Sequence, residues 1–253
     1  MPDPILLAPA LGEPITREPK REVTIKAALE LLTVTESRYA AGERGPDPHV
    51  HWRHVDAFYV LDGEMTYTFG REDETVVAGP GTFVLIPAGV VHTFANESDG
   101  HVRWLNFHAP DAGFAQFLRD SSPWDSHDPP ADRGRPAADA IVSPGDEGER
   151  FERTDRTITL KGEVPELSAL EIAFDPSFFV DPHQHDDHVD AFWVLDGEVA
   201  FTVGTEVVRV GPGTFAAAPP DARHGFANPA SGRARVLNLH APDAGFAAWI
   251  RSQ

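Results

Sequence analysis

The chain has 253 residues and a formal net charge of −19 at pH 7. Nucleic acids and anionic membrane surfaces are bound by clustered cations, so this balance argues against both as partners. The chain contains no cysteine, which excludes disulfides and thiolate metal sites and is compatible with a cytoplasmic location. Its length and its 41% hydrophobic content fit two domains of roughly 100–125 residues, each with a packed core.

Residues 1–20 contain five prolines and are predicted to form an extended N-terminal arm. The short apolar run between Pro4 and Pro9 follows an acidic residue, whereas a signal peptide begins with basic ones. The run is also far shorter than a membrane span. We therefore expect neither a signal peptide nor a transmembrane segment.

The rest of the chain is a tandem duplication. We place the first copy at residues 21–120 and the second at 150–253, separated by a linker at 121–149 that is rich in Pro, Asp and Gly. Five histidines of the first copy recur in the second, at an offset of 134 residues for the first three and 132 for the last two. The pairs are His49 and His183, His51 and His185, His54 and His188, His92 and His224, and His108 and His240. A two-residue insertion within residues 71–75 accounts for the change of offset. Such long-range self-similarity indicates two domains of the same fold.

Each copy is predicted to be an all-β sandwich or barrel. Runs rich in Val, Thr, Phe and Tyr are interrupted by Gly and Pro every 8–12 residues. Asp-Gly pairs at 62–63 and 196–197 predict tight hairpins. Near the end of each copy, Asp111 or Asp243 is predicted to cap a short helix. The apolar faces of these helices are predicted to cover the core and comprise Phe114, Phe117 and Leu118 in the first copy and Phe246, Trp249 and Ile250 in the second.

The repeated histidines favour a metal site in each copy. Residues i and i+2 of a strand point the same way, so His49 and His51 share a face, as do His183 and His185. Asp56 or Asp190 follows, and His92 or His224 arrives from a later strand. Three imidazoles and a carboxylate suit a divalent transition metal (Fe, Mn, Ni, Zn or Cu), up to one per barrel. The competing interpretation is that these are buried structural histidines, and their recurrence argues against it.

Two motifs in each copy resemble those of the cupin family, so the chain resembles a bicupin and, among cupins, a quercetin dioxygenase. The first motif, G-x5-H-x-H-x3-4-E-x6-G, is filled from His49 to Gly63 and from His183 to Gly197, except that the glutamate is Asp56 or Asp190. The second, G-x5-P-x-G-x2-H-x3-N, is matched by Gly81, Pro87, Gly89, His92 and Asn96 and by Gly213, Pro219, His224 and Asn228, with Asp221 replacing the inner glycine. The resemblance implies a double-stranded jelly-roll barrel for each copy. It also implies the metal ligands His49, His51 and His92 and, in the second copy, His183, His185 and His224.

The aspartates leave several roles open. Asp56 and Asp190 could coordinate the metal, act through a water or serve as a base. His54 and His188 could be additional ligands or could face solvent. His108 and His240 could line the pocket or pack between barrels, and we expect the unpaired His101 and His127 at the surface.

Aromatic residues share strand faces with the proposed ligands. Phe58, Phe94, Phe192 and Phe226 are predicted to line the substrate pocket, and the competing interpretation is plain core packing. An apolar wall suits an aromatic or enolic small molecule better than oxalate, a small dianion that calls for cations.

We therefore expect a metal-dependent dioxygenase in which Asp56 or Asp190 is the base. The first copy is slightly favoured as the active one because its motif is intact. The alternatives are a non-catalytic binding, sensor or storage bicupin, an oxalate-decarboxylase-like cupin and an isomerase cupin. The protein is expected to act on a small molecule as a monomer or homodimer.

Overall fold

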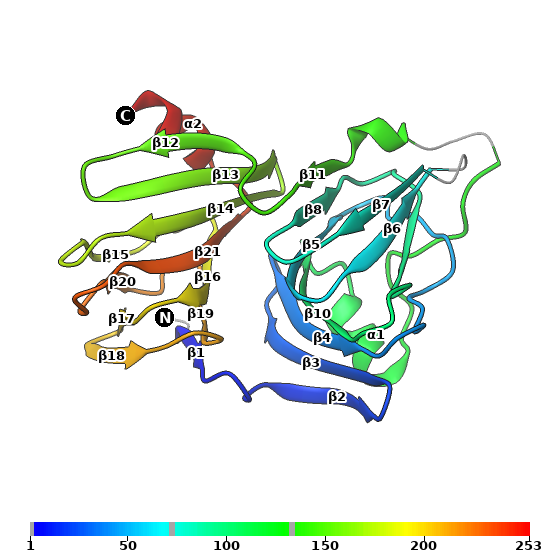
Figure 1. Cartoon of the computed structure of the whole chain (residues 1–253), viewed down its shortest axis with the longest axis horizontal. Coiled ribbons are helices and arrows are strands. Elements are labelled where there is room, and N and C mark those ends of the chain that lie inside the picture. The colour runs from blue at the N-terminus through cyan, green and yellow to red at the C-terminus, as the bar shows by residue number, and fades with distance from the viewer. Residues whose placement is uncertain (1–2, 71–73, 132–134) are drawn as a thin grey trace. The chain divides into compact units, whose positions relative to one another are not determined.

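The computed structural model describes residues 3–70, 74–131 and 135–253. These form two compact units (Figure 1). The first barrel comprises residues 12–147, and the second comprises residues 148–253 together with the N-terminal segment that ends at Leu11. Each is a jelly roll of two antiparallel sheets with a short helix after its last long strand. The predicted all-β class, two jelly-roll barrels with short helices, is confirmed.

The first barrel has a seven-stranded sheet in the order β11-β8-β5-β10-β4-β3-β2 and a three-stranded sheet in the order β7-β6-β9. Its elements are β2 (Glu13–Glu18), β3 (Arg21–Ala28), β4 (Thr33–Tyr39), β5 (Val55–Asp62), β6 (Met65–Phe69), β7 (Glu74–Ala78), β8 (Phe83–Ile86), β9 (His92–Ala95), β10 (Val102–Ala109), α1 (Phe114–Asp120), a 3-10 turn (Ala137–Asp139) and β11 (Ile141–Ser143). The two-residue insertion predicted within 71–75 falls mostly outside the described residues.

The second barrel repeats this plan. Its sheets have the orders β1-β19-β16-β21-β14-β13-β12 and β15-β20-β17-β18. Its elements are β1 (Ile5–Leu7), β12 (Glu149–Glu152), β13 (Arg156–Val164), β14 (Leu167–Phe174), β15 (Phe179–His183), β16 (Val189–Asp196), β17 (Val199–Val203), β18 (Glu206–Val210), β19 (Phe215–Ala218), β20 (His224–Ala227), β21 (Ala234–Ala241) and α2 (Phe246–Ser252). No described helix is long and apolar enough to span a membrane.

The predicted arm and linker contain strands that the sequence pattern does not predict. In the arm, β1 pairs with β19 of the second barrel and β2 pairs with β3 of the first. In the linker, β11 pairs with β8. Because β1 and β11 are three residues long and lie among prolines, neither shows the periodicity by which a strand is recognised. Their partners lie far away in the chain.

The Asp-Gly turns do not form the predicted hairpins. The strands before and after Gly63, β5 and β6, belong to different sheets, and so do β16 and β17 around Gly197. Gly63 has a φ of 76°, and a Cβ there would collide with the carbonyl oxygen of His101. Each turn therefore carries the chain from one sheet to the other past a neighbouring backbone, which glycine alone permits.

Replacing Gly63 with alanine is expected to lower the free energy of unfolding by more than about 2 kcal/mol, since a positive φ costs about 1–2 kcal/mol before the collision is counted. Gly204 is the matched control because it has a φ of 62° and no atom of the described residues lies within 4 Å of an added Cβ. Gly204→Ala should cost only the backbone contribution of about 1–2 kcal/mol. Urea denaturation measures both, and equal losses would contradict the assigned collision.

The terminal helices begin two residues later than predicted. Gly113, with a φ of 94°, precedes Phe114 at the start of α1. The Asp111 carboxylate lies two residues before Gly113 and accepts hydrogen bonds from the backbone N–H groups of Gly113 and Ala115. Asp243 does the same at α2. The prediction of core cover holds for the buried Phe114 and Ile250 but is wrong for Trp249, which is 50% exposed.

The two cores differ in the size of their side chains. In the first barrel, Val84 and Trp104 belong to a buried cluster with Phe58 and Tyr67. At the corresponding places in the second barrel's cluster stand smaller residues, among them Ala216 and Val236. At these two positions the first barrel carries the larger side chains.

Candidate metal centres

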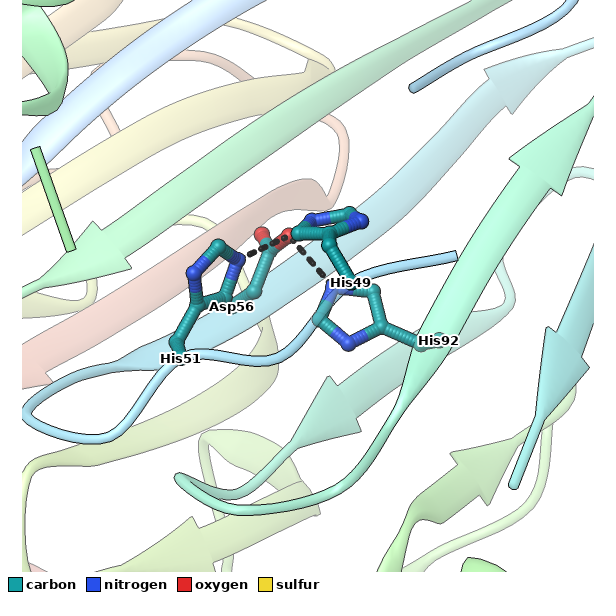
Figure 2. Close-up of side chains that lie close together, drawn as sticks. All are labelled: His49, His51, Asp56 and His92. Atoms are coloured by element: carbon teal, nitrogen blue, oxygen red, sulfur yellow. Dashed lines mark hydrogen bonds and ion pairs between the residues drawn. The ribbon is translucent and has the colours of Figure 1, made fainter. Parts of the chain in front are cut away.

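Four predicted ligands of the first copy lie together (Figure 2). The nitrogen and oxygen atoms that His49, His51, Asp56 and His92 could offer a metal all lie within 4.8 Å of one another, and all four residues are buried. His92 opens β9 and pairs with His49 through an isolated bridge, while Asp56 lies near the start of β5. His51 lies beyond the bridge rather than in a strand, so the predicted proximity of the two histidines arises without a regular strand.

The three imidazoles are held in one tautomer. A backbone carbonyl faces Nδ1 of each ring: Asp47 O at 3.0 Å from His49, Asp125 O at 2.6 Å from His51 and Val90 O at 3.0 Å from His92. Because a carbonyl only accepts, Nδ1 carries the hydrogen, and the Nε2 atom of a neutral ring has a free lone pair. Such outer contacts are typical of metal-binding histidines.

Burial, together with neighbouring His92 and His51, lowers the pKa of His49 to about 3. Its ring is therefore neutral near pH 7. The Nε2 atom of His51 is buried and has no hydrogen-bond partner among the described residues. A divalent metal would satisfy this atom, so the donor set fits such an ion.

Asp56 presents its two carboxylate oxygens to different partners. Oδ1 accepts a hydrogen bond of 2.5 Å from the Asn106 amide, while Oδ2 lies 3.3 Å from Nε2 of His92 and 3.8 Å from Nε2 of His51. Burial raises the pKa of Asp56, but His108, His51 and His92 outweigh it and hold the pKa well below its usual value. A carboxylate oxygen close to an imidazole lone pair needs a cation between them, either a proton or a metal ion.

The second copy has the same arrangement in a more open form. His183, His185, Asp190 and His224 form its cluster, in which the first two are only partly buried. Nε2 of His224 lies 3.1 Å from Oδ2 of Asp190, and the Asn238 amide donates to Oδ1 at 2.6 Å. Burial lowers the pKa of His224, yet its hydrogen bond to Asp190 raises it overall. Both copies therefore could hold a metal ion.

His54 does not face solvent, and that alternative is wrong. Its ring is fully buried, with Nδ1 2.9 Å from the Asp125 carboxylate and Nε2 3.0 Å from Nδ1 of His108. His51, His54 and His108 form a further group whose nitrogens lie within 4.8 Å of one another. His54 thus neighbours the four-residue cluster without belonging to it, and His108 lies beside Asp56.

His188 and His240 line a cavity of about 730 Å³ in the second barrel. The lining also includes the cluster residues His183, His185 and Asp190, so the cavity reaches the second candidate metal centre. Burial lowers the pKa of His240 to about 4. His240 thus lies in the cavity wall, which is one of the two places predicted for it.

The four phenylalanines predicted to line the pocket lie in different surroundings. Phe226 lines the cavity and also packs in the core of the second barrel. Phe58 and Phe192 are buried core residues, as the packing alternative proposes, and Phe94 packs at the margin of the first core. His101 and His127, which have no counterparts in the other copy, are exposed, as expected.

Several residues at these centres are absent from the sequence prediction. Asn106 and Asn238 orient the two aspartates, and their recurrence two residues before His108 and His240 is a signal that could have found them. Asp125 and Trp124 come from the predicted linker and have no repeat to reveal them. Arg156 lines the cavity, where its guanidinium pairs with Asp155 at 2.8 Å.

Solved structures that resemble the whole chain show the fold. A glyoxylate-induced protein from Pseudomonas aeruginosa matches with a TM-score of 0.70 at 14% identity, covering 94% of this chain and 89% of that one. The E. coli protein Ylba matches with a TM-score of 0.70 at 13% identity, covering 94% and 90%. Oxalate decarboxylase from Bacillus subtilis matches with a TM-score of 0.63 at 12% identity, covering 94% and 76%.

A quercetin 2,3-dioxygenase from Bacillus subtilis is 38% identical over 66 residues, which are 26% of this chain and only 18% of that protein. The model of the cupin domain matches twice, at residues 35–108 and 171–240, which together make up more than half of the chain. Both matches contain the histidine pairs described above. The chain belongs to the cupin family and carries two tandem cupin domains.

Proposed function

We propose that the protein is a metal-dependent dioxygenase that acts on an aromatic or enolic small molecule and binds it in the second barrel. The observation that carries the proposal is the cavity, whose volume of about 730 Å³ is in the range of small-molecule sites and which reaches the second histidine cluster. Its wall is largely apolar, with Ile158, Ile172 and Phe226 among its members. The limited match to a quercetin dioxygenase supports the same chemistry.

The proposed active copy differs from the one that the motif favours. The first copy has the intact second motif, but its four cluster residues are buried, whereas His183 and His185 of the second are partly exposed at the cavity. Because a substrate must reach the centre, the accessibility of the second cluster counts for more than the replacement of the inner glycine of the second motif by Asp221. We assign the first centre a structural role.

His183, His185, Asp190 and His224 would hold the metal, which would supply Lewis-acid chemistry toward substrate oxygens. The protein's own contribution begins with Asp190, whose pKa lies below its usual value because nearby His240 and His224 outweigh the effect of burial. It is ionised near pH 7. Asn238 binds one of its oxygens, which leaves the other facing the cluster, either as a ligand or as acceptor of a substrate hydroxyl proton.

The oxalate-decarboxylase-like alternative is less favoured by the cavity. Oxalate is a small dianion, and the guanidinium in the wall, Arg156, is already paired with Asp155 and lies over the Phe178 ring at 5.3 Å. A large, mostly apolar cavity would leave such a ligand without enough cationic partners.

Oxygen consumption tests the proposal. The Fe, Ni, Mn and Co forms should be screened against flavonols, catechols and β-diketones, with oxalate as a separate arm. We expect uptake with at least one aromatic or enolic compound and none with oxalate. Absence of uptake in every form would contradict the dioxygenase proposal, and release of carbon dioxide from oxalate would favour the alternative.

A further inference from the structure

An aromatic side chain covers the histidine surface of the first barrel. The Trp124 indole packs against two rings of helix α1, stacking on Phe117 at a centroid distance of 5.2 Å and lying 4.9 Å from Phe114. It also lies 4.9 Å from the His51 ring, 5.5 Å from His108 and 5.7 Å from His54. Trp124 is therefore a planar, bicyclic group seated directly beside the first metal centre.

The second barrel has the same surface without such a cover. The counterparts of the five rings, in order of sequence, are His185, His188, His240, Phe246 and Trp249, and all five line the cavity. Phe246 stacks on His240 at 3.7 Å and Trp249 stacks on Phe246 at 5.5 Å. Within the described part of this barrel, no further ring lies over them as Trp124 does over its partners.

Other differences between the copies make this place apolar and accessible. Backbone hydrogen bonds align Glu43 with Phe178, since the carbonyl oxygen of each accepts a hydrogen bond from the backbone N–H of the asparagine that ends the second motif. The neighbouring Arg44 then corresponds to Phe179, which lines the cavity and is 65% exposed. Trp249 is 50% exposed in the same wall. Large exposed apolar side chains that gather around one cavity indicate a ligand site.

We propose that the cavity of the second barrel binds a planar, bicyclic aromatic ligand, stacked on Phe246 and Trp249 beside His185, in the position that the Trp124 indole occupies in the first barrel. The inference rests on the proposed function for the identity of this ligand as the substrate, but the binding itself requires no reaction. It makes Trp249 a specificity-determining residue and Trp124 an internal substitute for the ligand.

Calorimetric titration of the purified protein with 2-naphthol under anaerobic conditions tests the site. We expect one molecule bound per chain and about tenfold weaker binding in Trp249→Ala, because a stacked aromatic contact and its buried area are lost. Trp52→Ala is the matched control, since Trp52 is similarly exposed at 43% but outside the surface described above. Its affinity should equal that of the wild type.

Removal of the Trp124 indole, which occupies the ligand's place in the first barrel, provides a second, independent measurement. Trp124→Ala should open the equivalent place in the first barrel, so that the number of 2-naphthol sites rises from one to two. If this variant does not fold, the Trp249→Ala comparison still decides. No binding to the wild type, equal affinity in Trp249→Ala, or a single site in folded Trp124→Ala would overturn the inference. Because binding is measured without oxygen, failure here leaves the oxygen-uptake result unaffected, and the reverse also holds.

Discussion

His224→Ala is expected to remove one metal ion per chain and to lower the proposed dioxygenase turnover by more than about 100-fold. His224 supplies one of three imidazoles, and its Nε2 lies 3.1 Å from the Asp190 carboxylate that completes the set. Loss of an outer contact alone typically costs 10–100-fold in metal affinity or activity, and loss of a ligand costs more. Initial rates of oxygen uptake and metal analysis of the same preparation measure the two effects.

His224→Gln serves as the control for packing, since it retains a polar side chain of similar length in β20 without an imidazole. It should fold as the wild type does and still lose the metal. A His224→Ala variant with full turnover would contradict the assignment of the reaction to the second barrel. Full metal content with lost turnover would instead make His224 a catalytic group rather than a ligand.

Asp125→Ala is expected to lower the free energy of unfolding by about 3–5 kcal/mol. The carboxylate is 1% exposed and accepts hydrogen bonds from the backbone N–H groups of Trp52 and Arg53 and from the His54 and His127 rings. Each bond to a charged acceptor is worth about 1.5–3 kcal/mol, and its removal leaves buried donors without partners. Chemical denaturation measures the loss.

The effect of Asp125 should depend on pH. Burial raises the pKa of this carboxyl, but hydrogen bonds with Arg53, His127 and His54 lower it to about 2, from a usual value of 3.8. A depressed pKa in the folded state contributes stability above the unfolded value, so the contribution is complete above about pH 4 and is lost as the pH falls toward 2. The difference between wild type and Asp125→Ala should shrink over that interval.

Asp187 provides the comparison in the second barrel. It binds Nδ1 of His188 at 2.6 Å, as Asp125 binds His54, but its side chain is 63% exposed. Asp187→Ala should therefore cost less than about 1 kcal/mol. If Asp125→Ala and Asp187→Ala lowered the free energy of unfolding by the same amount, burial would not explain the larger contribution expected of Asp125.

The repeats and motifs predict those parts of the structure that occur in both copies. His49, His51, Asp56 and His92 and their counterparts gather as expected because each copy of the motif folds into the same barrel. Strands β1 and β11 escape prediction because three-residue segments acquire their structure from a distant partner strand. The Asp-Gly turns mislead because the same local geometry can close a hairpin or carry the chain between sheets.

The asymmetry between the copies is the part that repetition cannot reveal. Trp124 and Asp125 belong to a segment with the composition of a linker, and nothing in their neighbours indicates that they pack on His51 and His54. The cavity likewise depends on whether an aromatic ring from outside the repeat packs over the histidine surface of a barrel. The spacing of Trp249 along its helix is typical of a residue that faces the core, yet its side chain lies in the cavity wall.

Metal content of the purified protein tests the duplicated metal centre most directly. Elemental analysis of the wild type, His92→Ala and His224→Ala should give about two, one and one divalent transition-metal ions per chain, because each variant removes a ligand from one cluster. A metal-free wild-type protein that binds no added divalent metal would contradict the account. So would two ions retained in both variants, since the metal would then lie outside the repeated histidines.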